Sequence, residues 1–266
     1  MKHYLKTAHG QIYYETELNF PDRPTVILLH GLSSNHTTWD AMVKKLQKAE
    51  INTLIWDQRG HGNSDMTRKA SLYTFPVFAE DLYQILQAES IEKASFVGYS
   101  YGGPILFELA KSHPEMVEHL VLISANCISP PYYMGVGFVT PVLYAFYTLL
   151  GWLLLWQSRK KYYYYKHGDA SGYIQSTLRG YTTMPLSVNF WMLAQMFRLD
   201  YRSLLPRLTM PVLIIRAEHD PFFSATEARY MARSLPNARI TSPKHPSHFV
   251  ASHAQDEIAD MVISFI

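Results

Sequence analysis

A serine flanked by two glycines has the surroundings that nucleophilic chemistry needs. It is Ser100, in the stretch Gly98-Tyr99-Ser100-Tyr101-Gly102. An apolar, β-favouring run over 94–97 precedes it, and a second apolar segment follows over 105–110. This order predicts a strand, a tight turn and a helix, a geometry that strains the serine backbone and lifts its hydroxyl above a sheet. The glycines remove Cβ atoms where strand and helix approach closely, and the helix N-terminus favours a developing anion.

An activated serine needs a base, and the base needs an acid that orients it. A late apolar strand over 212–215 runs into Arg216-Ala217-Glu218-His219-Asp220-Pro221. Sites on open α/β sheets form past the carboxyl ends of such strands, so we predict that Asp220 is the acid. Glu218 is nearer to the strand end and is the alternative. The preceding strand ends in Ser124-Ala125-Asn126, which offers no carboxylate.

The chain has 12 histidines, and position in the sequence selects among them. His248 lies in Pro246-Ser247-His248-Phe249, between the last short strand and the final helix. In an acyl-transfer site of this chain order the base comes near the C-terminus, so we predict that His248 is the base. His245 and His253 are the alternatives, which we expect at solvated loop or helix positions.

Acyl transfer also needs hydrogen-bond donors for the tetrahedral oxyanion. One donor is expected from the backbone N–H of Tyr101, the residue directly after the nucleophile. The other is expected from the backbone N–H of Leu32, in the loop His30-Gly31-Leu32 that follows a buried strand over 25–29. A backbone donor places no demand on the side chain, so these two predictions rest on position alone.

Together these motifs resemble the α/β-hydrolase fold family, and the resemblance covers nearly the whole chain. His30-Gly31 resembles the oxyanion turn of that family, and Asp57-Gln58-Arg59-Gly60-His61-Gly62-Asn63-Ser64 resembles its D-x-R-G-x-G-x-S stretch. By analogy Asp57 and Arg59 brace a loop and take no part in chemistry. Ser247 departs from the glycine that relatives often carry before the histidine. Because the nucleophile is a serine, the resemblance excludes the haloalkane dehalogenase and epoxide hydrolase branches, whose nucleophile is an aspartate.

Elements that position these residues alternate along the chain. After a hairpin over 4–20, we predict strands over 25–29, 52–56, 94–97, 119–124, 212–215 and 238–241, and helices over 39–49, 76–88, 224–235 and 255–265. The strands are apolar on both faces, which indicates a mostly parallel sheet covered by helices on both sides. The fold class is therefore α/β, with a doubly wound sheet. We predict a core of residues 1–128 and 204–266, with a mainly helical cap of residues 129–203 inserted after the sixth strand.

Overall composition limits the function classes. The chain has 266 residues, of which 48% are hydrophobic and 17% charged, and its formal net charge is +2. Nothing here favours a nucleic-acid partner. The one cysteine, Cys127, excludes an internal disulfide and is expected to be buried. The N-terminal residues lack the apolar core of a secretory signal, so a cytoplasmic location is expected. No metal or organic cofactor is implied.

The inserted segment is unusually poor in charge. Residues 119–158 contain no Asp, Glu, Lys or Arg. Aromatic and large apolar residues are frequent, namely Tyr132, Tyr133, Met134, Phe138, Tyr144, Phe146, Trp152 and Trp156. Such a cap suggests an apolar substrate pocket, and each ring has packing of the cap onto the core as its alternative role. A membrane span over 136–156 is interrupted by Pro141 and Gly151. Reversible contact with a lipid surface, or pairing of two caps, remains open.

We therefore expect a serine hydrolase that cleaves a hydrophobic carboxylic ester, with a medium- or long-chain acyl or an aromatic group, through an acyl-serine intermediate. A thioesterase, an amidase or a C–C bond hydrolase would use the same triad, and the sequence does not separate them. A non-catalytic ligand receptor on the same fold is the alternative from another class.

Overall fold

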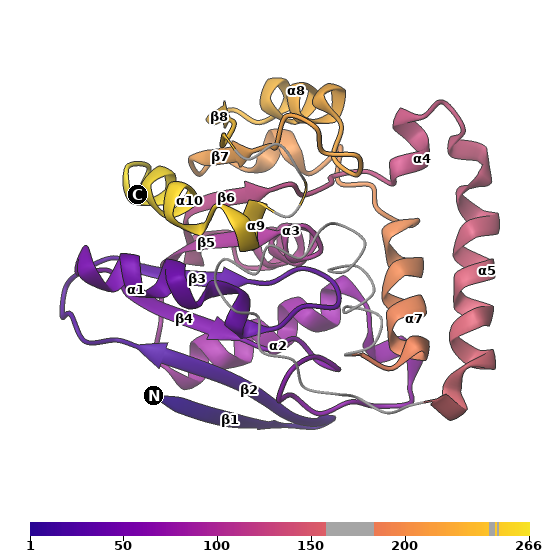
Figure 1. Ribbon diagram of the computed structural model, residues 1–266, viewed down its shortest axis with the longest axis horizontal. Coiled ribbons are helices and arrows are strands. Elements are labelled where there is room, and N and C mark those ends of the chain that lie inside the picture. The colour runs from indigo at the N-terminus through magenta and orange to yellow at the C-terminus, as the bar shows by residue number, and fades with distance from the viewer. Residues whose placement is uncertain (158–183, 245–247, 249) are drawn as a thin grey trace.

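A computed structural model describes residues 1–157, 184–244, 248 and 250–266. Its centre is an eight-stranded sheet in the order β1-β2-β4-β3-β5-β6-β7-β8 (Figure 1). The hairpin β1–β2 is antiparallel and β2 joins β4 antiparallel, whereas all other pairs are parallel. The strands are β1 Lys2–Thr7, β2 Gly10–Glu17, β3 Thr25–Leu29, β4 Asn52–Trp56, β5 Ala94–Tyr99, β6 Val117–Ile123, β7 Val212–Ile215 and β8 Ala238–Thr241. The predicted mostly parallel sheet is confirmed.

Helices cover both faces of the sheet. Those of the core are α1 Asp40–Lys48, α2 Phe75–Ala88, α3 Gly102–Ser112, α8 Ala225–Ser234, α9 Val250–His253 and α10 Gln255–Ile263. Between β6 and β7 lie α4 Pro130–Tyr133, α5 Thr140–Leu153 and α7 Leu186–Met196. Short 3-10 helices are η1 His36–Trp39, η2 Ala70–Leu72, η3 Pro114–Met116, η4 Gly137–Val139, η5 Leu155–Gln157 and η6 Leu205–Arg207. Each predicted core helix is present, and its bounds differ from the prediction by at most two residues. The 3-10 helix η1 directly precedes α1.

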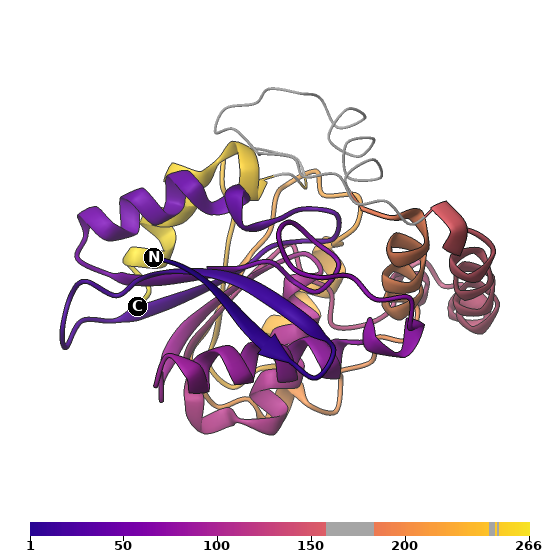
Figure 2. The same cartoon turned by 90° about the horizontal axis from the view of Figure 1, so that it is seen from below.

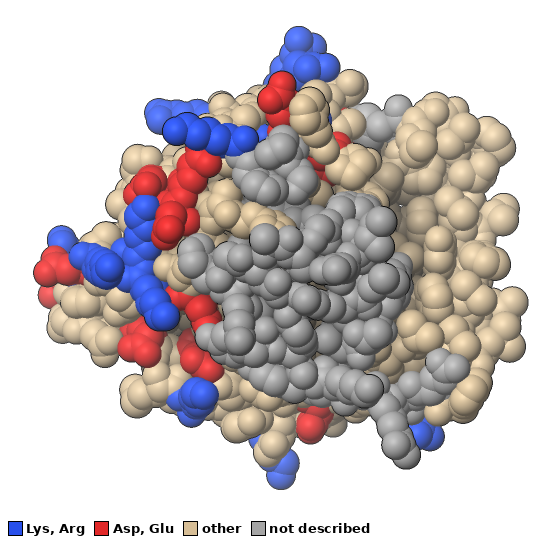
Figure 3. Space-filling model, in the orientation of Figure 1, with Lys and Arg blue, Asp and Glu red and all other residues tan. Residues whose placement is uncertain are grey.

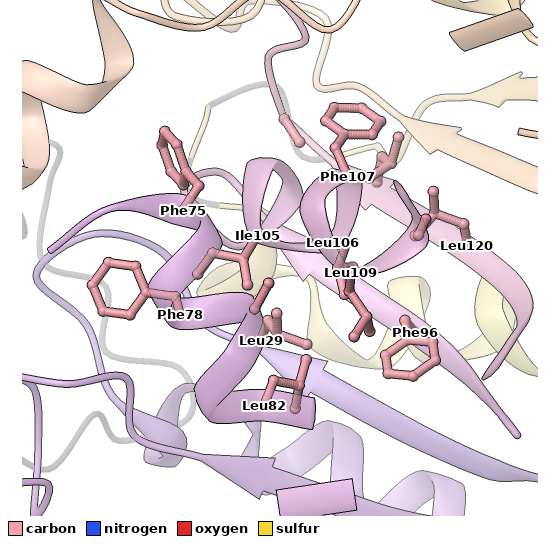
Figure 4. Packing of buried hydrophobic residues seen from close by; sticks show 14 of the residues in the cluster. Leu29, Phe75, Phe78, Leu82, Phe96, Ile105, Leu106, Phe107, Leu109 and Leu120 are labelled. Carbon is pink, nitrogen blue, oxygen red and sulfur yellow. The ribbon is translucent and has the colours of Figure 1, made fainter. Parts of the chain in front are cut away.

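Alternate side chains of each buried strand enter different cores. In β3, Val26 and Leu28 pack with α1 and α10, whereas Ile27 and Leu29 pack with α2 and α3. Figure 2 shows these helix pairs on opposite sides of the sheet, and Figure 4 shows the apolar packing around α2 and α3. A strand buried on both faces has no polar alternation, which explains the continuous apolar runs of the sequence.

The insertion joins the core through a paired neck. An antiparallel bridge links Ile128 to Asp200. Beside it, the Ser129 N–H donates to the Leu199 carbonyl at 3.0 Å, and the Tyr201 N–H donates to the Cys127 carbonyl at 2.8 Å. We call residues 127–129 and 199–201 the neck. Cys127 is buried there, as expected. The neck lies close to the predicted cap boundaries at 129 and 203, and the division into core and cap stays a prediction.

Two helices of the insertion pack tightly together. Pro141 stands at the start of α5, where its missing N–H costs nothing. Gly151 lies within α5 against α7, and a Cβ there would stand 2.3 Å from the ring of Trp191. Pro141 therefore does divide the apolar segment 136–156, whereas Gly151 lies within α5 and permits its close packing. In the described part of the chain, no helix is both long and apolar enough to span a membrane.

Most of the aromatic and large apolar residues that we expected to line a pocket in the insertion are exposed to solvent. Six of the eight are exposed, namely Tyr132, Met134, Phe138, Phe146, Trp152 and Trp156. Tyr144 is half-buried, and the side chain of Tyr133 lies outside the described residues. The buried residues of the insertion come instead from α7, including Val188, Trp191 and Met192. Apolar residues on α5 look alike in the sequence whether they face inward or outward, and this is why the expectation failed.

Candidate active site

Ser100 occupies a strained turn between β5 and α3. Its φ is +50°, a left-handed conformation that is uncommon for residues other than glycine. A Cβ on Gly98 would lie 2.7 Å from Leu106 Cδ1 and 2.9 Å from the Gly102 carbonyl carbon. A Cβ on Gly102 would lie 2.8 Å from the Leu29 carbonyl oxygen. Both glycines are therefore required by close backbone approach, and the turn places Ser100 at the carboxyl end of β5.

Ser100, His248 and Asp220 are brought together from three distant parts of the sequence. The Ser100 Oγ lies 3.1 Å from His248 Nε2, and His248 Nδ1 lies 2.9 and 2.8 Å from the two carboxylate oxygens of Asp220. A carboxylate can only accept, so Nδ1 carries the hydrogen, and Nε2 accepts from the serine hydroxyl. This connectivity is that of a nucleophile, a base and an orienting acid.

The loop after β7 holds Asp220 in place. Its Oδ1 accepts backbone N–H groups from Phe222 at 2.9 Å and Phe223 at 3.0 Å. Burial would raise the pKa of Asp220, but the hydrogen bond and charge of His248, together with the Phe222 N–H, outweigh it and lower that pKa. Asp220 is therefore ionised and can stabilise a positive charge on the ring of His248.

The alternative acid and bases are not in this arrangement. Glu218 is exposed to solvent. His253 lies half-buried at the end of α9, whereas His245 lies outside the described residues. Among the described residues only His248 bonds to both Ser100 and Asp220. The catalytic roles of Ser100, Asp220 and His248 stay predictions, and the hydrogen bonds among these residues are consistent with those roles.

The loop after β3 reaches the serine. A Cβ on Gly31 would lie 3.4 Å from the Ser100 Cβ, so the main chain at 31–32 adjoins the nucleophile. Within the described residues, no hydrogen bond uses the N–H of Leu32 or of Tyr101. Tyr101 directly precedes α3, where N–H groups lack intrahelical partners. These positions agree with the predicted oxyanion donors, whose role stays a prediction.

Two neutral histidines fix this loop. Burial lowers the pKa of His30 to about 4. Its Nδ1 donates to the Gly31 carbonyl at 2.8 Å, and its Nε2 accepts the Gln58 N–H at 3.2 Å. The ring of His61 packs edge-on against that of His30, and its Nε2 accepts the N–H of Ser33 at 3.2 Å. The loop geometry therefore depends on side chains from the segment after β4.

Asp57 and Arg59 brace that segment, as the resemblance implied. The buried carboxylate of Asp57 accepts from His36 Nδ1 at 2.9 Å and from the Asn63 N–H at 2.7 Å. Arg59 donates to Asp81 Oδ1 at 2.6 Å, and both side chains are buried. Neither Asp57 nor Arg59 contacts the Ser100–His248 pair through any described hydrogen bond.

Two supporting residues were missed in the sequence. Asn189, in α7, accepts a hydrogen bond from the Ser33 hydroxyl. Glu227, in α8, accepts from the Cys127 N–H at 2.8 Å and from Asn126 Nδ2 at 2.8 Å. The pattern Ser224-Ala225-Thr226-Glu227 is typical of a capping box, and the Ser224 hydroxyl does cap the Glu227 N–H at 3.0 Å. That pattern locates Glu227 at a helix start, but it does not predict that its carboxylate binds the neck.

A family model described as the α/β hydrolase fold matches residues 24–166, more than half of the chain. The chain belongs to this family. An uncharacterized protein of Mycobacterium tuberculosis is 32% identical over 125 residues, which are 47% of this chain and 35% of that protein. Human ABHD8 is 24% identical over 91% of this chain and 54% of its own length. The chain thus spans a third to a half of these curated relatives.

Solved structures agree on the fold. An esterase of Exiguobacterium antarcticum superposes with a TM-score of 0.79 at 16% identity, over 100% of this chain and 99% of that one. Identity this low shows the fold alone. Family membership supports a hydrolase activity, without specifying the substrate. In the described part of the chain, no three His, Cys, Asp or Glu side chains are grouped as a metal site requires.

Proposed function

We propose that this protein is a serine hydrolase that cleaves a hydrophobic carboxylic ester through an acyl-serine intermediate. The observation that carries the proposal is the continuous hydrogen-bonded series Ser100–His248–Asp220, with the serine on a left-handed turn at the end of a central strand. An isolated surface serine has no such base and no such strain. Covalent catalysis at Ser100 follows from the activation of its hydroxyl by His248.

In the acylation step, the Ser100 Oγ attacks the ester carbonyl carbon while its proton passes to His248 Nε2. The anion that forms on the carbonyl oxygen is stabilised by the N–H groups of Leu32 and Tyr101. Asp220 stabilises the imidazolium and keeps Nδ1 protonated. The C–O bond to the leaving group then breaks, and His248 returns the proton to the departing alkoxide.

In the deacylation step, water replaces the alcohol. His248 Nε2 removes a proton from the water, and the resulting hydroxide attacks the acyl-serine carbonyl. The second tetrahedral intermediate uses the same two N–H donors. Its collapse breaks the bond to the Ser100 Oγ, which takes the proton from His248. The products are a carboxylic acid and free enzyme, and no external oxidant or cofactor takes part.

The hydrophobic substrate class rests on the aromatic residues near the base. The ring of Phe222 lies edge-on to His248 at 5.0 Å, and that of Tyr99 lies 5.6 Å away on β5. An acyl or aromatic group bound beside these residues would gain by apolar burial, at roughly 25 cal/mol per Å².

A series of p-nitrophenyl esters from acetyl to palmitoyl tests the proposal. Wild type should show kcat/KM that rises with chain length, and Ser100→Ala should abolish it. Ser71→Ala, an exposed serine in η2, is the matched control and should match wild type. Activity limited to the shortest esters would reject the hydrophobic substrate class, and equal activity of wild type and Ser100→Ala would reject the nucleophile.

A thioesterase or C–C bond hydrolase with the same triad would be recognised in parallel assays. Acyl-thioesters and vinylogous diketones should be turned over more slowly than the best p-nitrophenyl ester. A receptor would give no turnover of any of these compounds, together with a rise in melting temperature on ligand addition.

A further inference from the structure

Helix α5 is apolar on all sides. Its 14 residues, Thr140–Leu153, include no charged side chain. Its inner side already has a partner, because Gly151 touches Trp191 and the ring of Tyr147 stacks on those of Phe190 and Phe197. A helix that is apolar on every side normally has apolar surroundings on every side.

Among the described residues, none gives the outer side of α5 such surroundings. Six residues at helical spacing form what we call the α5 face, namely Val142, Phe146, Leu149, Trp152, Leu153 and Trp156. Each is half exposed or more, with 57% for Leu149, 60% for Leu153 and 77% for Trp156. Both ribbon views place α5 at the outer edge of the molecule, beyond α7 (Figures 1 and 2). The visible surface along α5 carries no charged side chain in Figure 3.

Positive charge lies beside the α5 face. The guanidinium of Arg198 lies 5.1 Å from the centre of the Tyr144 ring, and that of Arg202 lies 5.5 Å from the Tyr132 ring. Arg202 is neutralised by Asp200, at 2.7 Å. Arg198 is exposed and has no carboxylate partner among the described residues. The nearby sequence 119–158 supplies no acidic residue that would repel an anion.

We propose that the α5 face binds the surface of an anionic lipid bilayer, with the helix lying in the plane of the headgroups. The exposed apolar residues of the α5 face, with tryptophan at one end and Arg198 beside them, are suited to burial at the boundary between headgroups and acyl chains. Tryptophan and tyrosine are favoured at the headgroup level, where one edge of the ring is apolar and the other is wet. Arg198 would contact lipid phosphates. This inference is independent of the proposed ester hydrolysis.

A second copy of the chain is a less suitable occupant. A two-fold pair would bring the same surface of each copy together. Such a pair would bury the two α5 faces, but residues 119–158 of either copy supply no acidic partner for Arg198. The charge beside the α5 face complements a negatively charged bilayer, and it does not complement itself.

Flotation with vesicles tests the proposal. The full chain is mixed with vesicles of phosphatidylcholine alone or with added phosphatidylglycerol. Wild type should float with the anionic vesicles, at least several-fold more than with the neutral ones, and salt at about 1 M should weaken the difference. The double variant Leu149→Glu/Trp156→Glu should bind the anionic vesicles at least tenfold more weakly than wild type. Arg198→Gln should lose only the preference for anionic lipid.

A matched control is Ile240→Glu, which places a carboxylate at an exposed apolar residue of β8. It should float as wild type does. The tryptophan fluorescence of wild type should shift to the blue when vesicles are added, and Trp156→Phe should reduce that shift. This variant tests the contact of the α5 face with lipid without introducing a charge. Failure of wild type to float, or equal flotation of the double variant, would overturn the proposal. A dimer in light scattering that the double variant abolishes would assign the α5 face to a second copy instead.

Discussion

The hydroxyl of Ser33 donates a hydrogen bond to the side-chain oxygen of Asn189, 156 residues later in the chain. Ser33 has a φ of +60° in the loop after β3, and Asn189 is buried in α7. The loop that we expect to supply an oxyanion donor is therefore tied to a helix of the insertion. A change in α7 can reach the site through this bond.

Asn189→Ala should lower kcat by roughly tenfold with a smaller effect on KM. Loss of a whole oxyanion donor costs about 10²–10³ in rate, and a displaced loop would lose part of that. Ser33→Ala should give a similar decrease, and the double variant should be no worse than either single variant because both remove the same bond. Additive losses of activity would show that the two residues act separately.

Asp220→Asn should lower kcat by roughly 10⁴-fold while the protein remains folded. The asparagine oxygen still accepts the N–H groups of Phe222 and Phe223, so the loop keeps its shape. Its amide, however, favours the histidine tautomer with the proton on Nε2, which cannot accept from Ser100. Steady-state kinetics and a melting curve measure the two effects separately.

Glu218→Gln is the matched control for that variant. Glu218 is exposed in the same loop, and its change should leave kcat within about twofold of wild type, as for most surface substitutions. A large loss in Glu218→Gln with activity retained in Asp220→Asn would reverse the assignment of the acid.

Gly98→Ala should lower both stability and kcat. The added methyl would meet Leu106 and the Gly102 backbone at less than 3 Å, and overpacking of this kind costs about 1–3 kcal/mol. Gly135→Ala is the comparison, because its φ is +74° but nothing lies within 4 Å of the added atom. Gly135→Ala should lower the free energy of unfolding by about 1–2 kcal/mol through backbone strain and leave kcat unchanged. Urea unfolding and esterase kinetics measure the stability and the kcat of both variants. Equal kcat for Gly98→Ala and Gly135→Ala would contradict the prediction.

Glu227 should make the stability of the fold depend on pH. Burial raises its pKa from 4.5 to about 7, against the hydrogen bonds from Asn126 and Cys127, which lower it. The folded protein therefore holds a proton that the unfolded chain releases. This contribution is fully present below pH 4.5 and is lost as pH rises through about 7; it amounts to about 3 kcal/mol at most.

Urea unfolding of wild type and Glu227→Gln at several values between about pH 5 and about pH 8 measures this contribution. The free energy of unfolding of wild type should fall relative to that of the variant as pH rises. Glu92→Gln, on an exposed side chain, should track wild type throughout. A difference between wild type and Glu227→Gln that does not change with pH would contradict the prediction.

The central sheet and the turn at Ser100 could be predicted from the sequence because each depends on local pattern. A strand buried on both faces carries a continuous apolar run, as β3 does over 26–29 and β4 over 54–56. The turn at Ser100 requires glycine at 98 and 102 for steric reasons that act within the pattern itself. Asp220 and His248 follow a strand end and precede a helix, so their order along the chain located them before any contact was known.

The remaining contacts depend on partners that the sequence does not place. Asn189 looks like any polar residue of an apolar helix until Ser33 is brought beside it. Glu227 matches a capping pattern, but its carboxylate also accepts the N–H groups of Cys127 and Ile128 in the neck, which the pattern does not predict. The outward side of α5 resembles a core-facing helix, because apolar residues carry no mark of which side meets solvent. Long-range packing decides all three.

Covalent labelling of Ser100 tests the central claim most directly. Wild type, Ser100→Ala, Ser71→Ala and His248→Ala are incubated with a fluorophosphonate, and the adduct is followed by intact mass and by peptide mapping. We predict one adduct on Ser100 in wild type and in Ser71→Ala, none in Ser100→Ala, and labelling at least 10²-fold slower in His248→Ala, as expected when a general base is removed. An unlabelled wild type, an adduct at another residue, or equal labelling rates with and without His248 would contradict an activated Ser100.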